Sequence, residues 1–116
     1  MSLTEARTLV EPLTALADPT RLQIIGVLRR QDHCVCHLVE GLDLKQSLIS
    51  HHIGVLRRAG LVTSYPHPDD RRWLYYRLNR DALRSVTCAL DQLADDAEYD
   101  PTPLPCPIDL APSERQ

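Results

Sequence analysis

Two cysteines, Cys34 and Cys36, lie two residues apart in the first third of the chain, flanked by His33 and His37. Thiolates are nucleophiles and soft metal ligands, and imidazole nitrogens bind zinc and related divalent ions. The other two cysteines, Cys88 and Cys106, lie far along the chain. This pattern predicts a site for a soft metal ion, or thiol oxidation that links Cys34 or Cys36 to Cys88 or Cys106.

The pair must be positioned by a short helix, which we expect from Cys34 to Glu40 with Gly41 as a left-handed cap. Residues two apart on a regular helix point about 200° apart, so their sulfurs cannot meet on one ion. We therefore hypothesise that a bound ion favours an unwound helix start at Cys34–Cys36. Such a change would shift this helix against the next one.

Other helices are predicted by apolar spacing. Ala6 to Ala17 forms an amphipathic helix that Pro12 is expected to kink or split. Asp18 and Pro19 begin a second helix that ends near Arg30, since Asp is a good cap and Pro suits the first position. A further helix is expected over residues 45–59, with a buried side made of Leu48, Ile49, Ile53, Val55 and Leu56.

Alternating residues then predict a β-hairpin from Leu61 to Leu78, with a charged loop over residues 66–71. A last helix starts at Asn79 or Asp81. The fold class is therefore mainly α with a two-stranded β wing, the winged helix-turn-helix arrangement. We expect one DNA-binding and dimerisation domain over residues 1–98. Residues 99–116 hold five of the nine prolines and are expected to form an extended tail.

Charge is distributed unevenly along the chain. The net charge is −3, but residues 45–80 carry +5 between two acidic ends. This is typical of a local phosphate-binding surface. On the helix over 45–59 and on the hairpin, polar and basic side chains suit contacts to base edges and phosphates. The candidate DNA-binding residues are Lys45, Gln46, Ser47, Ser50, His51, Arg57, Arg58, Arg71 and Arg72. Ser47 has a second interpretation as the helix N-cap, and His51 and His52 do not form a chelating pair because adjacent helical residues do not share a face.

Length and composition limit the function classes. The chain has 116 residues, no apolar run of the ~20 residues that span a bilayer, and no pattern of a signal peptide. We expect a cytoplasmic protein with no membrane contact, whose four cysteines are thiols rather than structural disulfides. No nucleophile–base or phosphate-loop pattern is present, so we expect no enzyme.

Three stretches make the sequence similar to the ArsR/SmtB family of metal-responsive repressors. They are Ala15 to Ile25, Cys34 to Leu38 and Leu44 to Val62, joined by the strand Trp73 to Leu78. The resemblance implies a homodimer built from the first and last helices, bound to double-stranded operator DNA and released by an inducer. The stripe of Leu83, Val86, Leu90 and Leu93 suits such a dimer face, although burial within one subunit would produce the same pattern.

Cys34 and Cys36 resemble the arsenic-sensing branch of this family, which implies As(III) or Sb(III) as inducer and no catalytic cofactor. The best-known pattern has a third cysteine where this chain has Val39. Cys106 is the first choice for a third ligand, while Cys88 and His37 are possible ligands. The zinc site that some members carry on the last helix is rejected, because residues 81–98 contain no histidine.

Two alternatives stay open at this stage. His33 and His37 flank the cysteines and would suit a divalent soft metal (zinc, cadmium or lead), so a repressor of the same fold that senses such a metal or thiol oxidation is possible. A zinc-stabilised protein-interaction module is the other, and it would need metal in order to fold.

Overall fold

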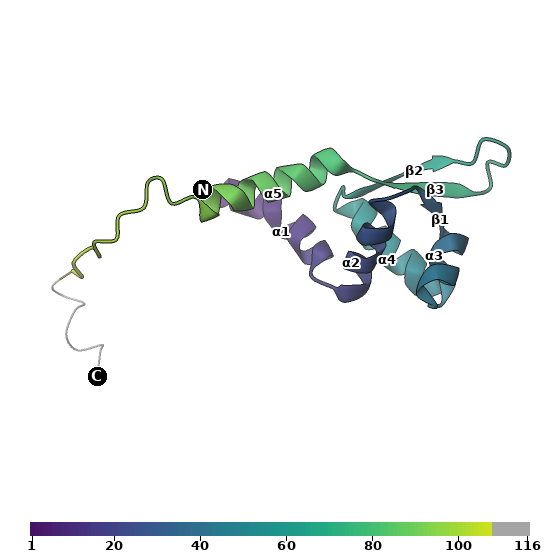
Figure 1. Ribbon diagram of the computed structural model, residues 1–116, viewed down its shortest axis with the longest axis horizontal. Helices are drawn as coiled ribbons and strands as arrows, with labels where there is room; N and C mark the ends of the chain where they lie inside the picture. The colour runs from purple at the N-terminus through teal and green to yellow at the C-terminus, as the bar shows by residue number, and fades with distance from the viewer. Residues whose placement is uncertain (108–116) are drawn as a thin grey trace.

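The computed structural model describes residues 1–107. Within them the chain is mainly helical, with a small antiparallel sheet (Figure 1). The elements in chain order are α1 (Leu3–Leu16), α2 (Pro19–Leu28), β1 (His33–Cys34), α3 (Val35–Leu42), α4 (Gln46–Arg58), β2 (Val62–Pro66), β3 (Leu74–Leu78) and α5 (Arg80–Ala94). This is the winged helix-turn-helix predicted from the sequence.

The helix starts follow local chemistry. Asp18 accepts a hydrogen bond from the Arg21 amide ahead of Pro19, and Asn79 accepts one from the Ala82 amide. The prediction that Pro12 splits α1 is wrong, because the helix runs without a break from Leu3 to Leu16 with Pro12 inside it.

The sheet has three strands rather than the two expected, in the order β1-β3-β2. His33 pairs with Tyr76 and Cys34 with Tyr75, so two residues before α3 extend the wing by a short edge strand. The expected boundaries of α3 were also wrong. Its first residue is Val35, Gly41 lies inside it, and Asp43 adopts the left-handed conformation at its end, with φ of 53°.

One apolar core joins α2, α3, α4 and the sheet. From α4 it receives Ile49, Ile53 and Leu56, each at most 2% exposed. Leu48, expected to be buried, is 41% exposed because it lies off the row that these three residues form. Leu61 and Val62 continue the core into β2.

At the other end of the molecule, α1 packs against α5 (Figure 1). Beyond Ala94, residues 95–107 form neither helix nor strand, and the rest of the predicted tail lies outside the described residues. Among residues 1–107, the helices are all too short or too polar to traverse a lipid bilayer.

Candidate metal centre and nucleic-acid interface

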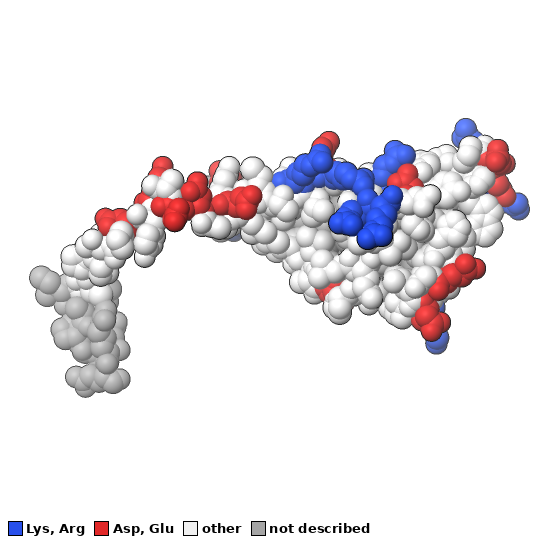
Figure 2. All heavy atoms as spheres, viewed as in Figure 1, with Lys and Arg blue, Asp and Glu red and all other residues white. Residues whose placement is uncertain are grey.

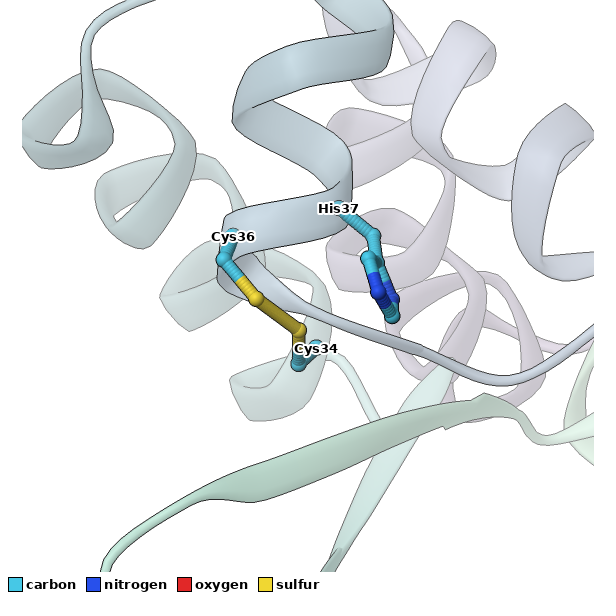
Figure 3. A group of neighbouring side chains, drawn as sticks. All are labelled: Cys34, Cys36 and His37. Atoms are coloured by element: carbon cyan, nitrogen blue, oxygen red, sulfur yellow. A yellow bond between two sulfur atoms is a disulfide. The ribbon is translucent and has the colours of Figure 1, made fainter.

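Cys34, Cys36 and His37 meet where β1 passes into α3 (Figure 3). The two sulfurs and a ring nitrogen of His37 lie within 4.8 Å of one another. Cys34 is buried, whereas Cys36 and His37 are exposed. The three ligand atoms therefore form a cluster that is open to solvent on one side and fixed to the sheet on the other.

The two cysteines form a disulfide, with Cα atoms 5.4 Å apart. This corrects two expectations: that all four cysteines are thiols, and that oxidation would join this pair to Cys88 or Cys106. The physical reason is the backbone of Cys34, which is extended (φ −83°, ψ 168°) and precedes the first helical residue. Because only Cys36 is helical, the 200° divergence of a regular helix does not apply. The unwound start that we had expected an ion to induce is present without one.

An aromatic cavity of about 250 Å³ opens beside the disulfide. Besides the cluster, its lining contains His67, Trp73 and Tyr75. The ring of His67 stacks on Tyr75, with centroids 5.3 Å apart, and its Nδ1 accepts hydrogen bonds from two amides of the wing loop. His67, Trp73 and Tyr75 were not among the residues predicted for the site. Their only signal was the aromatic character of β3, which pairs with the strand that carries Cys34.

Asp32 connects the residues before β1 to the other two strands. Its Oδ2 accepts a 2.5 Å hydrogen bond from the Tyr65 hydroxyl and a 3.1 Å hydrogen bond from Arg77 Nε. The Arg77 guanidinium also lies 4.6 Å from the centre of the Tyr65 ring. The hydrogen bond to Asp32 is the main reason that the pKa of Tyr65 is raised. Through these contacts, Asp32 holds the segment just before Cys34 against both β2 and β3.

The remaining candidate ligands are not part of the cluster. His33 Nδ1 is 2.7 Å from the Gln31 carbonyl oxygen, and its ring meets that of His37 edge to face at 5.8 Å. Cys88 and Cys106 are exposed, on α5 and on the segment after it. Figure 1 shows that segment leading away from the end of the molecule that carries β1 and α3.

The exposed side of α4 carries the residues predicted to contact DNA. Gln46, Ser47, Ser50, His51, Arg57 and Arg58 are all exposed, and their spacing places them along one side of the helix. Lys45, also exposed, is the N-cap residue. Ser47 therefore lies inside the first turn, and its interpretation as the cap is wrong.

His52 belongs to the interior. It is 8% exposed, and its Nδ1 lies 3.1 Å from a guanidinium nitrogen of Arg21, which also donates to the backbone carbonyls of Thr14 and Ala15. Burial is the largest cause that lowers the pKa of His52, and the Arg21 charge acts in the same direction. The neutral ring can accept a hydrogen bond from Arg21, which fixes α4 against α1 and α2.

On the wing, Arg71 and Arg72 are exposed, but Arg72 forms a two-point ion pair with Asp70, at 2.7 and 2.9 Å. This pairing lowers the pKa of Asp70. Figure 2 shows another group of basic side chains over the start of α5. Three arginines that are not among the predicted DNA-binding residues line a depression there: Arg77, Arg80 and Arg84.

The sequence pattern described as "Bacterial regulatory protein, arsR family" matches residues 18–64. An SmtB transcriptional repressor homolog from Synechocystis is 42% identical over 62 residues, which are 53% of this chain and 47% of that protein. The chain thus spans about half of that relative's length. The arsenical resistance operon repressor of Bacillus subtilis is 37% identical over 73 residues, 62% of this chain and 67% of the repressor.

Solved structures give the same picture of the fold. An ArsR-like transcriptional regulator from Rhodococcus sp. RHA1 superimposes with a TM-score of 0.71 at 26% identity. The superposition covers 79% of this chain and 84% of the regulator. The similarity therefore extends beyond residues 18–64 to most of the described elements.

Proposed function

Because the chain belongs to the ArsR family of bacterial regulatory proteins, we propose that it is a repressor that arsenite or antimonite releases from operator DNA. As a transcriptional regulator of this family, it is not an enzyme. The observation that carries the proposal is the cluster of Cys34, Cys36 and His37 at the start of α3. Because α3 packs on α4, an ion held there acts on the helix that faces DNA.

The DNA contact is proposed for the exposed side of α4, which enters the major groove in winged helix-turn-helix proteins. Gln46, Ser50 and His51 would meet base edges, while Arg57 and Arg58 at the C-terminal end suit phosphates. Arg71 and Arg72 on the wing would reach the neighbouring backbone. Asp70 competes for Arg72, so Arg71 is expected to be the stronger phosphate contact.

We propose that two copies bind one operator and meet through α1 and α5. Four apolar side chains on these helices are 40–67% exposed although the helices pack together: Leu3, Val10, Leu90 and Leu93. Covering such residues in a dimer removes apolar surface from water. A twofold axis between the copies matches an operator with dyad symmetry.

The inducer needs reduced sulfurs. Arsenite, As(OH)₃, loses two hydroxyl groups as water when two thiols replace them, and a third thiol can replace the last. Cys34 and Cys36 supply two sulfurs, and Cys106 stays our proposed third ligand. Because its segment leads away from the site of its own chain, Cys106 would come from the partner copy.

Two other signals are supported by specific contacts. The position of His37 in the cluster favours a divalent ion such as cadmium or zinc over arsenic. The disulfide between Cys34 and Cys36 favours thiol oxidation as the signal. In the oxidised form neither sulfur is a thiolate, so oxidation and ion binding exclude each other.

The test begins with a duplex selected from random sequences by the reduced protein. Its affinity is then measured by fluorescence polarisation alone, with arsenite, with antimonite, with cadmium and after oxidation by a disulfide reagent. A coupling of ~3 kcal/mol would weaken binding about 150-fold with arsenite. The response should vanish in Cys34→Ser and persist in the control Cys88→Ser. Unchanged affinity with both metalloids would contradict the proposal, and a response to cadmium or oxidant alone would support the corresponding alternative.

The third ligand has its own measurement. Arsenic X-ray absorption should count three sulfurs per arsenic in the reduced protein and two in Cys106→Ser. A count of two in both proteins would exclude Cys106.

A further inference from the structure

The cluster supplies two sulfurs, whereas trivalent arsenic forms three bonds. Cys36 is the only cysteine of α3, and the residue one helical turn after it is Val39. Inorganic arsenite on this pair keeps a hydroxyl group or needs a thiol from elsewhere. An arsenic atom that already carries a carbon substituent needs only two sulfurs.

Both cysteines line the aromatic cavity, so it borders any atom that they hold between them. It adjoins both sulfurs and has a volume of about 250 Å³, several times the roughly 30 Å³ that one water molecule occupies in the liquid. His67, Trp73 and Tyr75 form its wall, and the stacked pair of His67 and Tyr75 shows that rings pack there face to face. A single metal ion would fill only a small part of this volume and would leave Trp73 exposed to solvent.

We propose that this site takes trivalent organoarsenicals, and aryl ones above all, in preference to inorganic arsenite. The inference rests on the proposed function, since it names the ligand class of the same site. An aryl ring packs against Trp73 and Tyr75 while arsenic bonds to Cys34 and Cys36. Burying this apolar ring, with offset or edge-on contacts to the wall, stabilises the complex.

The reaction is an exchange without a change in oxidation state. R–As(OH)₂ and two thiols give R–As(S-Cys)₂ and two waters: two As–O and two S–H bonds break, and two As–S and two O–H bonds form. The disulfide must first be reduced. A phosphine does this in vitro: R₃P and water convert the disulfide into two thiols, and the phosphine leaves as its oxide.

The substituent would contact the wing directly. His67 and Trp73 border the loop that carries Arg71 and Arg72, and the backbone amide of each hydrogen-bonds within that loop. Unlike a bare ion, an aryl group thus touches both the start of α3 and the loop that we propose to lie on DNA. It is expected to displace DNA at least as strongly as arsenite does.

Trp73 is the only tryptophan of the chain and reports on the cavity. Phosphine-reduced protein is titrated with phenylarsenous acid, methylarsenous acid and arsenite, and Trp73 fluorescence and calorimetric affinity are recorded without DNA. We expect one phenylarsenical per chain, bound at least tenfold more tightly than arsenite, and the largest fluorescence change with the phenyl compound. A phenyl-to-arsenite affinity ratio near one would overturn the inference.

Variants separate the wall from the sulfurs. Trp73→Ala should lower the phenyl-to-arsenite ratio at least threefold with arsenite affinity unchanged, and Trp73→Phe should retain the ratio. Arsenite affinity also shows that each variant is folded. The control is Tyr99→Ala, an exposed aromatic residue outside the cavity, which should change neither affinity. An equal loss of both affinities in Trp73→Ala would also overturn the inference.

These outcomes are distinct from failure of the proposed function. If arsenite binds and releases DNA but the phenyl compound has no advantage, only the inference fails. If neither compound binds the reduced pair or releases DNA, the proposed function fails, and the inference fails with it.

Discussion

The Tyr65 hydroxyl donates a 2.5 Å hydrogen bond to the Asp32 carboxylate, which joins the residue before β1 to the wing. The same carboxylate forms an ion pair with Arg77 on β3, at 3.1 Å. Cys34 lies two residues further along the chain and pairs with Tyr75 on the same sheet. A movement at the sulfurs can therefore reach the wing through strand pairing and through this carboxylate, in addition to the contact of α3 with α4.

Asp32→Asn is the test of this route. An amide is a weaker acceptor than a carboxylate, so the contact between Asp32 and the wing should weaken. The variant should keep its arsenite affinity. The factor by which arsenite lowers DNA affinity should be about ten times smaller than in the unchanged protein. Polarisation with and without arsenite measures this coupling, and calorimetry measures the affinity. The pKa of Tyr65, followed by ultraviolet absorbance, should fall. Unchanged coupling together with a lowered pKa would show that the contact is structural only.

The residues proposed to contact DNA, on α4 and on the wing, should separate into two classes. Gln46→Ala is expected to reduce the free energy of binding to the selected duplex by about 1–3 kcal/mol. The variant should also discriminate less at one base position. Arg71→Ala should instead weaken binding to all duplexes alike and reduce the slope of log K against log salt by about 1. Polarisation titrations from low to moderate salt measure both effects. If Gln46→Ala lost the same affinity for the selected duplex and for random DNA, Gln46 would contact the DNA backbone and not a base.

The proposed dimer face makes a prediction about assembly. Leu93 is 60% exposed on α5, and Leu93→Glu should shift sedimentation from dimer to monomer, since a charge would be buried at the interface. DNA affinity should fall with it. Leu104→Glu provides the matched control, because Leu104 is 91% exposed on the segment after α5. A dimer that tolerates Leu93→Glu would place the interface elsewhere.

His52 makes stability depend on pH. Its pKa is lowered in the folded chain, so the unfolded chain binds the proton more readily and stability falls as pH drops below about 6.5. For one titrating group, the free energy of unfolding changes by at most about 1.4 kcal/mol per pH unit. Urea unfolding between pH 7.5 and 5.5 measures this slope. The pH range lies above the one in which Asp18, whose pKa is also lowered, becomes protonated.

His52→Asn is the informative variant, because its amide oxygen can still accept a hydrogen bond from Arg21 but does not titrate. We expect the slope to decrease in this variant. The control His51→Asn, on the exposed neighbour, should retain it. A slope unchanged in His52→Asn would assign the pH dependence to other groups.

The sequence predicted those parts of the fold that depend on local patterns. Asp18 with Pro19 and the apolar spacing of Ile49, Ile53 and Leu56 are such patterns, and the helices start and pack as they indicate. β1 could not be predicted, because two residues have no detectable alternation and form a strand only by pairing with β3. Asp43 took the role expected of Gly41, because Asp also tolerates the left-handed conformation.

The candidate site divides in the same way. Cys34 and Cys36 lie close in sequence and were predicted as ligands, whereas the cluster contains His37, only a possible ligand, and not Cys106, the first choice for the third. The contacts of Asp32 with Tyr65 and of Arg21 with His52 bridge 33 and 31 residues. Such pairs depend on how the elements pack, and no single stretch of sequence encodes them.

One consequence of α4 concerns the design of biosensors. Its inner side contributes Ile49, Ile53 and Leu56 to the core, while the side that we propose to read DNA is exposed and shares no residue with the cysteine cluster. Substituting only the exposed positions of α4 would therefore change which DNA sequence the protein binds and leave the inducer-binding site unchanged. DNA specificity and inducer response could then be combined from different proteins in one reporter.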